Sequence, residues 1–418
     1  MPTPVILGLL RNPDFRAFLI ANALERFAAS AMTVLLGLQV YDLTHDPLDL
    51  GWLGLAEAIP GITLVLYGGH LADRHSRRRI MLLTSMLLAV LAAGLALVTG
   101  AGRADLTAIL VTAFLSGVIR AFENPAASGL EAQVVPLHQL MRGVSLLVTS
   151  GRVADMLGPA VGGIVWSWLG AESTYAVIAA IFALACLALL VGGREHPAAA
   201  PAHVRDESTW QRIAEGFRYV AGNQLLLGSM ALDLFAVFFG GATALLPAIA
   251  TDVLHAGPTG LGLLRSAASA GALLSAVGAV RFIARRRAGW MLHGVIAGFG
   301  VSMVVFGLSR SLPLSLAALF VSGLCDGTSM IIRRAILRLA SPEALRGRIS
   351  AVRMIFIGSS NELGALESGI AASLIGTGPA IWAGGLATLA IVGATALAAP
   401  KLRRLDLDAM TRAQVVER

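Results

Sequence analysis

Twelve stretches of about 20 mainly apolar residues run through this 418-residue chain, and they constrain its fold more than any other feature. A helix rises about 1.5 Å per residue, so roughly 20 residues are needed to cross a hydrocarbon core of about 30 Å. Each stretch is therefore long enough to be a membrane-spanning helix. The predicted spans cover residues 15–41, 48–71, 80–99, 106–128, 143–169, 174–192, 225–250, 260–284, 290–308, 312–332, 349–374 and 379–399.

The pattern inside these stretches favours helices over a barrel. Backbone groups in lipid must be hydrogen-bonded internally, which leaves helices or closed barrels of alternating strands about ten residues long. Residues 82–91, LLTSMLLAVL, do not alternate. Only 14% of the residues are charged and 56% are hydrophobic, which nearly excludes a water-soluble enzyme. We expect an all-α membrane protein with twelve transmembrane helices in two pseudo-symmetric six-helix bundles.

The cations gather in alternate connections between the spans. Cytoplasmic segments of membrane proteins carry an excess of arginine and lysine. With both termini inside, 25 cations fall in inner segments and only Arg103 and Arg310 fall in outer loops. This asymmetry predicts cytoplasmic termini and an even number of spans. It also makes the net charge of +7 a topology signal, so nucleic acid is not an expected partner.

The longest break between spans divides the chain into two halves. Residues 1–193 are predicted to form an N-terminal six-helix bundle, 194–224 a cytoplasmic linker, 225–400 a second six-helix bundle, and 401–418 a cytoplasmic tail. The halves echo each other, as expected of transporters built from repeats. The linker contains a short amphipathic helix whose apolar face consists of Trp210, Ile213, Phe217 and Val220.

The most specific motif lies between the second and third spans. Residues 69–79, GHLADRHSRRR, resemble G-x-L-a-D-r-x-g-R-r, the loop signature of the major facilitator superfamily. An aspartate at a helix end beside cations can hold a gate through charge pairs that break when two bundles move. The alternative is a positive-inside anchor with one incidental aspartate. The predicted gating residues are Gly69, Asp73, Arg74, Arg77 and Arg78.

A second motif lies in the fifth span, where residues 158–163 have the sequence GPAVGG. It resembles the antiporter signature of the same superfamily, which is associated with exporters, although Ala154 replaces the leading glycine. Small residues let helices approach closely, and proline bends a helix. Generic small-residue packing is the alternative. The residues assigned to this motif are Gly158, Pro159, Gly162 and Gly163.

The resemblance extends over nearly the whole chain, from residues 12–16 to the twelfth span. Four short runs look like the bacterial branch that includes the enterobactin exporter and macrolide-efflux-like proteins: NPAA at 124–127, VP at 135–136, LGP at 157–159 and SPEALRGR at 341–348. The resemblance implies a twelve-helix, proton-coupled exporter of the inner membrane, and it does not specify the cargo. We expect the cargo to be an amphipathic small molecule, a drug or siderophore, moved by alternating access, and the protein to be a monomer. A solute importer or proton symporter of the same fold is the alternative, and a non-transporting scaffold or receptor is a further one.

Thirteen charged residues lie away from the ends of the predicted spans. Each costs about 2.5–3.5 kcal/mol at the centre of a helix, so each needs a partner, water or a function. They could form a static paired network, or one or two of the acids could take up the transported proton. The acids are Glu25, Glu57, Glu123, Asp155, Asp233, Asp326, Glu362 and Glu367, and the bases are Arg26, Arg120, Arg152, Arg265 and Arg353.

A smaller set is predicted to couple protons or bind cargo. Asp155, with Arg152 one turn before it, is the preferred proton carrier. Arg120 lies where many superfamily members carry a buried arginine linked to proton coupling; pairing with Glu123 or another acid is the alternative. Glu25 and its neighbour Arg26 do not face each other on a helix. The full set is Asp155, Arg152, Arg120, Asp233, Glu362, Glu367, Arg353 and Glu25.

The sequence lacks the motifs that mark several other classes of protein. The sequence has no G-x-x-x-x-G-K-[ST] phosphate loop, which argues against an ATP-driven pump. It has no H-E-x-x-H and no paired cysteines, so no metal or other cofactor is expected. Cargo, protons and the lipid bilayer are the expected partners.

Overall fold

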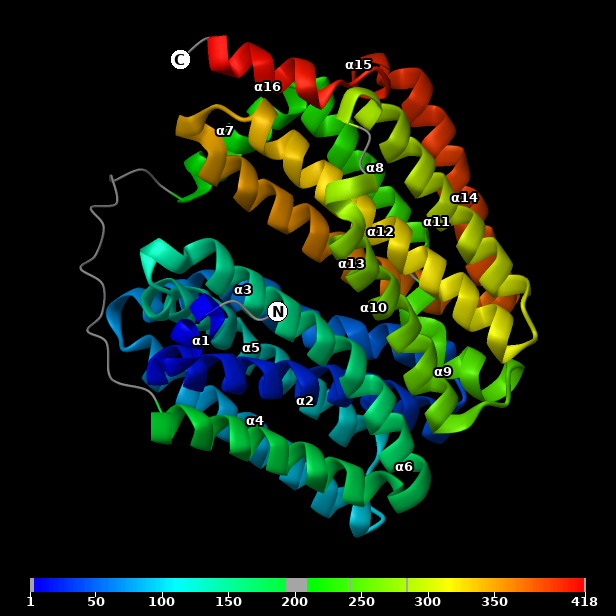
Figure 1. Cartoon of the computed structure of the whole chain (residues 1–418). Helices are drawn as coiled ribbons and strands as arrows, with labels where there is room; N and C mark the ends of the chain where they lie inside the picture. Colours follow the sequence, from blue (N-terminus) through cyan, green and yellow to red (C-terminus); the bar gives the residue numbers. More distant parts are fainter. Residues whose placement is uncertain (1–3, 193–208, 241, 283–284, 417–418) are drawn as a thin grey trace. The chain divides into compact units, whose positions relative to one another are not determined.

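The computed structural model describes residues 4–192, 209–240, 242–282 and 285–416, and within these ranges the chain is almost entirely helical and has no strand (Figure 1). The long helices are α2 (Pro13–Thr44), α3 (Pro47–Arg74), α4 (Arg77–Gly100), α5 (Leu106–Val134), α6 (Leu140–Gly192), α8 (Gln224–Gly240), α10 (Gly257–Phe282), α11 (Ala288–Leu308), α12 (Leu312–Ala340), α13 (Arg346–Ile375) and α14 (Thr377–Ala398). The shorter helices are α1 (Pro4–Arg11), α7 (Thr209–Gly222), α9 (Leu246–Ala248), α15 (Pro400–Arg403) and α16 (Leu407–Val416), with single turns η1 (Leu137–Gln139), η2 (Ala242–Leu245), η3 (Ile249–Val253), η4 (Arg285–Arg287) and η5 (Glu343–Leu345).

Each predicted span falls on described helix over most of its length. Ten helices of the described residues are long and apolar enough to cross a membrane. One of them, α6, is 53 residues long and holds both the fifth and the sixth span. The two spans are separated by a kink at Gly170, whose backbone leaves the helical conformation with φ 78° and ψ 176°. The eleventh span is α13, whose apolar part is the shorter stretch Leu363–Ile375. The prediction of an all-helical membrane fold is confirmed.

Side-chain caps begin the first spans at defined residues. Asn12 accepts a hydrogen bond from the backbone N–H of Asp14 at 3.0 Å, and a proline follows it at the first position of α2. Asp46 caps α3 in the same way. Such caps satisfy N–H groups that have no partner inside the helix, and proline there removes one such group.

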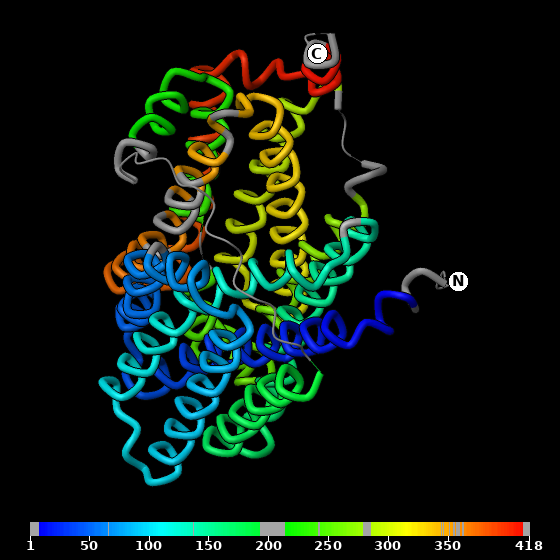
Figure 2. Tube along the Cα trace, turned by 90° about the vertical axis from the view of Figure 1, so that its left-hand side faces the viewer, coloured from blue at the N-terminus to red at the C-terminus, as the bar shows by residue number. Residues whose placement is uncertain are grey.

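The described residues group into two compact units. Unit 1 comprises the described residues within 1–203 and 255–266, and unit 2 comprises those within 204–254 and 267–418. In unit 1, α2 packs along α6, and α3 packs along α5; α2 is the dark blue helix in Figure 2. The core of unit 1 at the α3–α4 end includes Phe15, Phe18, Met81, Leu130 and Leu189.

The amphipathic helix expected in the linker is α7, and it packs on α13 within unit 2. Val220 is buried, the hydroxyl of Tyr219 donates to the carbonyl oxygen of Ala340 at 3.2 Å, and Glu215 forms an ion pair with Arg348. The side chains of Trp210 and Ile213, and residues 194–208 of the predicted linker, lie outside the described residues. The domain boundaries given above stay predictions.

Candidate functional site

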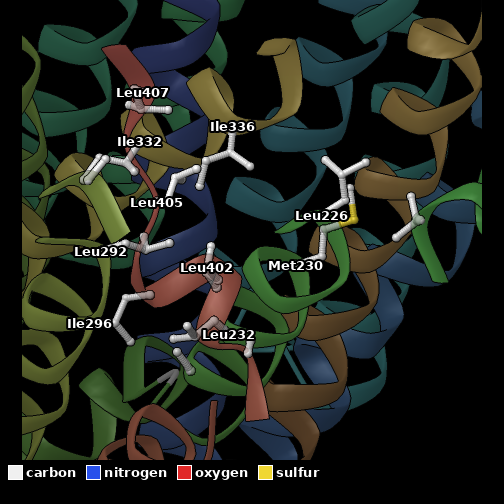
Figure 3. Close-up of a cluster of buried hydrophobic side chains, with 14 of the residues drawn as sticks. Leu226, Met230, Leu232, Leu292, Ile296, Ile332, Ile336, Leu402, Leu405 and Leu407 are labelled. Atoms are coloured by element: carbon white, nitrogen blue, oxygen red, sulfur yellow. The ribbon is translucent and has the colours of Figure 1, made fainter. Parts of the chain in front are cut away.

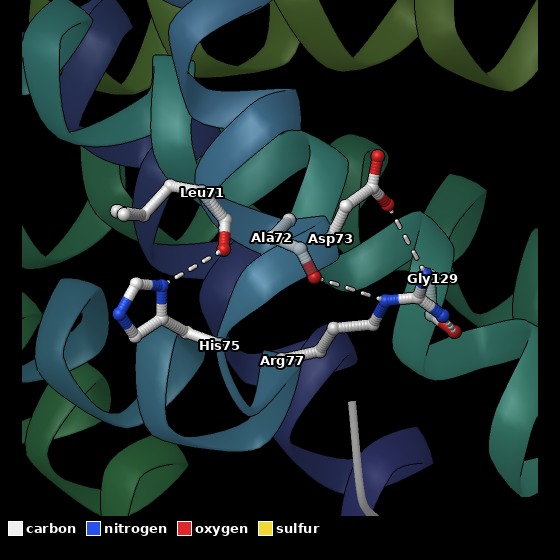
Figure 4. Close-up of polar contacts among 6 residues, drawn as sticks. All are labelled: Leu71, Ala72, Asp73, His75, Arg77 and Gly129. Atoms are coloured by element: carbon white, nitrogen blue, oxygen red, sulfur yellow. Dashed lines mark hydrogen bonds and ion pairs between the residues drawn. The ribbon is translucent and has the colours of Figure 1, made fainter. Parts of the chain in front are cut away.

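The predicted gating motif forms the end of α3 and the start of α4 (Figure 4). Only His75 and Ser76 separate the two helices. Arg77 donates from Nη1 to the carbonyl oxygen of Gly129 at 2.9 Å and from Nε to that of Ala72 at 3.4 Å. Its Nη2 lies 3.5 Å from Oδ1 of Asp73, whose side chain is 70% exposed. Arg77 is therefore held mainly by carbonyls at helix ends, where a cation is favoured, and its pair with Asp73 is weak.

The other members of this motif have different surroundings. Arg78 donates to the carbonyl oxygens of Leu189 and Leu190 near the end of α6, and Arg74 is exposed. A methyl group at Gly69 would meet nothing within 4 Å, whereas at Gly68 it would overlap the carbonyl oxygen of Ala121 on α5. The close approach between α3 and α5 therefore depends on Gly68, which the motif does not include.

The glycines of the fifth-span motif permit close helix packing inside unit 1. A methyl group at Gly158 would overlap the carbonyl oxygen of Phe27 on α2, and one at Gly163 would overlap that of Pro258 at the start of α10. Gly162 faces Ala31 on α2, and Pro159 lies inside α6. The packing reading of these residues agrees with the structure, and their part in antiport stays a prediction.

The intramembrane charges of unit 1 pair between helices. Asp155 on α6 forms an ion pair with Arg26 on α2, a different partner from the Arg152 that precedes it by one turn. Arg152 has contacts of its own. Arg120 on α5 pairs with Glu57 on α3, with Nη1 and Oε1 2.7 Å apart. Arg120 therefore forms its ion pair with Glu57 and also acts electrostatically on Glu123, and its part in proton coupling stays a prediction.

Arg120 also reaches α2, since its Nη2 lies 3.3 Å from the carbonyl oxygen of Ala29 and 3.4 Å from the hydroxyl of Thr33. Arg265, at the start of α10, interacts electrostatically with Asp155 and with Glu57. These two ion pairs, Arg26–Asp155 and Arg120–Glu57, therefore belong to one network of charges.

Glu25 and Glu123 form a second kind of contact in unit 1. Glu25 is 2% exposed and accepts a hydrogen bond from the hydroxyl of Ser85 on α4. Its side chain is also hydrogen-bonded to the carboxyl group of Glu123 on α5. Arg120 and Arg26 are the cations that act on Glu123. Glu25 was expected as a candidate, but its pairing with Glu123 joins residues 98 positions apart and has no signal in the sequence.

In unit 2 the charges centre on Arg333 of α12. It forms an ion pair with Asp233 on α8, and its Nη2 lies 3.6 Å from Asp326 and 3.0 Å from the hydroxyl of Ser329. The predicted span ends at residue 332, but α12 continues to Ala340, so Arg333 lies within the helix and is buried. The spacing of Asp326, Ser329 and Arg333 puts them on one helix face and could have revealed this.

The remaining candidates of unit 2 are placed less closely together. Arg353 lines a small cavity beside Asp233 and Arg333. Glu367 is half-buried, and its carboxylate lies 3.5 Å from the hydroxyl of Ser368. The side chain of Glu362 lies outside the described residues. Among the described residues, no group of three or more His, Cys, Asp or Glu side chains could hold a metal ion.

The sequence profile of the Major Facilitator Superfamily matches residues 18–365, so the chain belongs to that superfamily. It is a multi-pass membrane transporter, and the resemblance predicted from its motifs is confirmed.

Two relatives and two solved structures give the comparison. The chain is 29% identical over 371 residues to the multidrug efflux pump Tap of Mycolicibacterium fortuitum, covering 86% of this chain and 89% of the relative. It is 24% identical over 350 residues to the enterobactin exporter EntS of Citrobacter koseri, covering 83% and 82%. The nucleoside transporter NupG matches with a TM-score of 0.71 at 15% identity over 95% of this chain and 98% of that one. A peptide-transporter-family (POT) structure matches with a TM-score of 0.75 at 12% identity over 93% and 96%, and both structural matches show the fold alone.

Proposed function

We propose that this transporter exports an amphipathic small molecule, a drug or siderophore, across the bacterial inner membrane in exchange for protons, by alternating access. Its relatives carry the names of a multidrug efflux pump and a siderophore exporter. Cytoplasmic termini, supported by the cation asymmetry, and a monomeric state belong to the same proposal.

The observation that carries proton coupling is the contact between Glu25 and Glu123. An ionised carboxylate can only accept hydrogen bonds, so two carboxyl groups that bond to each other need a proton between them. Burial makes two free negative charges there costly. The pair is therefore suited to bind one proton inside unit 1 and to release it when its surroundings change.

The arginines beside the pair supply a way to change those surroundings. Arg120 and Arg26 act on Glu123 but are held by other acids, Glu57 and Asp155. A guanidinium group that leaves its acid and turns to Glu123 favours the ionised pair, and the proton is released. In this account Asp155 acts through Arg26, and its direct protonation is the alternative.

The test uses everted membrane vesicles with an internal pH-sensitive dye and an imposed proton gradient. Ethidium and a catecholate siderophore serve as two cargo probes. We expect one of them to trigger proton release from wild-type vesicles, and Glu25→Gln and Glu123→Gln to lower the coupled flux about tenfold or more, as for loss of a group that carries the proton. Glu172→Gln, which removes an exposed acid of unit 1, is the control and should behave as wild type.

Two results would count against this function. Proton uptake in the same direction as cargo indicates the symporter alternative. If the rate of cargo transport into wild-type vesicles does not depend on the imposed proton gradient, antiport is contradicted. Retained exchange of labelled cargo by the two glutamine variants shows that they are folded.

A further inference from the structure

The segment after α14 is fixed to the core of unit 2. Leu402, Leu405 and Leu407 are buried beside Leu292 and Ile332 (Figure 3). This segment begins the stretch that the sequence predicts to be a tail, and its buried leucines hold the intervening residues in place.

The backbone of this segment is in direct contact with the start of α11. The N–H of Gly289 donates to the carbonyl oxygen of Leu405 at 3.3 Å. A methyl group at Gly289 would overlap the carbonyl oxygens of Leu402 and Arg403. The segment is therefore a rigid support for the side chains that point away from the core.

Two of those side chains, Lys401 and Arg404, are exposed and line a surface cavity with the apolar residues Leu225, Leu405 and Met410. In the part of the chain that the structure describes, neither cation forms an ion pair. The cavity thus joins a basic rim to an apolar wall.

One acid also lines this cavity, but it is engaged elsewhere. Oδ1 of Asp406 accepts hydrogen bonds from the backbone N–H groups of Asp408 at 2.8 Å and Ala409 at 3.0 Å. It therefore caps α16, where a negative charge is favoured by the helix dipole. The cavity retains an excess of positive charge.

The neighbourhood has the composition of a membrane–water interface. Trp290 is 57% exposed, and the guanidinium carbon of Arg403 lies 5.6 Å from the centre of its ring. The exposed Arg286 and Arg287 belong to η4, which packs against α16. Tryptophan is enriched at that depth, and basic residues there attract acidic lipids.

We propose that the cavity between the start of α8 and the segment α15–α16 binds the headgroup of an anionic phospholipid. Lys401 and Arg404 contact the phosphate, and the apolar wall contacts the adjoining part of the acyl chains. This site is independent of the cargo and of the coupling ion.

The experiment uses the purified full-length protein in two kinds of nanodisc. One contains phosphatidylcholine alone, and the other also contains about 30% phosphatidylglycerol, which makes the surface negative like that of a cytoplasmic leaflet. Thermal unfolding and native mass spectrometry of retained lipid are measured for wild type and for Lys401→Gln/Arg404→Gln. The matched control is Arg16→Gln/Arg142→Gln, which removes two exposed cations of unit 1.

We expect phosphatidylglycerol to raise the unfolding temperature of the wild type and the control, with one such lipid retained. The Lys401→Gln/Arg404→Gln variant should bind it about thirtyfold more weakly, as for loss of two charges near a lipid surface. Equal binding by this variant and the control overturns the proposal. So does equal stabilisation by phosphatidylcholine, or by inorganic phosphate added to discs of phosphatidylcholine, which would indicate a site for free anions.

Discussion

Replacing Arg333 by glutamine should lower the stability of the protein by about 3–5 kcal/mol, because removal of one partner leaves a buried charge uncompensated. The side chain of Arg333 is only 9% exposed, and it joins Asp233 on α8 to Asp326 and Ser329 on its own helix. Without the guanidinium group, the carboxylate of Asp233 loses the ion-pair partner that the structure gives it. Unfolding of the purified protein in detergent, followed by tryptophan fluorescence, measures the loss.

A double substitution separates the lost ion pair from simple loss of packing. Asp233→Asn in the Arg333→Gln background should recover part of the stability, because the uncompensated charge is then gone. Arg338→Gln removes an exposed arginine from the same helix and should change little. If the Arg333→Gln variant is as stable to unfolding as the wild type and the Arg338→Gln variant, then Arg333 does not hold the charges of unit 2 together.

Two neighbouring glycines should respond differently to the same substitution. Gly68→Ala should destabilise the protein by about 1–3 kcal/mol, because the added methyl group overlaps a backbone carbonyl that cannot move without its helix. That carbonyl belongs to Ala121 on α5. Gly69→Ala, one residue further on, meets nothing within 4 Å and should be neutral or slightly stabilising, since alanine favours helices.

The comparison needs only the unfolding temperatures of the two variants at equal detergent concentration. Retained expression of both variants keeps the measurement possible. A larger loss for Gly69→Ala than for Gly68→Ala would mean that the motif glycine, rather than its neighbour, sets the approach of α3 to α5.

The positions of the spans could be predicted because the signal for a span lies in consecutive residues. The backbone N–H and C=O groups of about 20 consecutive apolar residues must be hydrogen-bonded within one helix, whichever helices surround it. The ends of the helices were harder, because charged residues continue them: α12 runs on through Arg333 and Arg338 to Ala340. The kink at Gly170, which divides α6 between two predicted spans, agrees with the expected break.

The partners of the buried charges could not be predicted in the same way. Positions one turn apart on a helix can be recognised from sequence, which suggested Arg152 for Asp155. The observed pairs, Arg26 with Asp155 and Arg120 with Glu57, join different helices across 129 and 63 positions. Such pairs depend on which helices are neighbours, and the spacing of residues along a single sequence does not reveal that.

The most direct test of the proton-coupled account is the infrared spectrum of the purified protein at neutral pH, compared in H₂O and D₂O. The account predicts a protonated-carboxyl band in the wild type that is lost in Glu25→Gln and in Glu123→Gln. The band should persist in Glu172→Gln, which removes an exposed acid, and it should disappear when transported cargo saturates the protein. A carboxyl band that is the same in the wild type, Glu25→Gln and Glu123→Gln would contradict it, because the pair would then hold no proton to exchange.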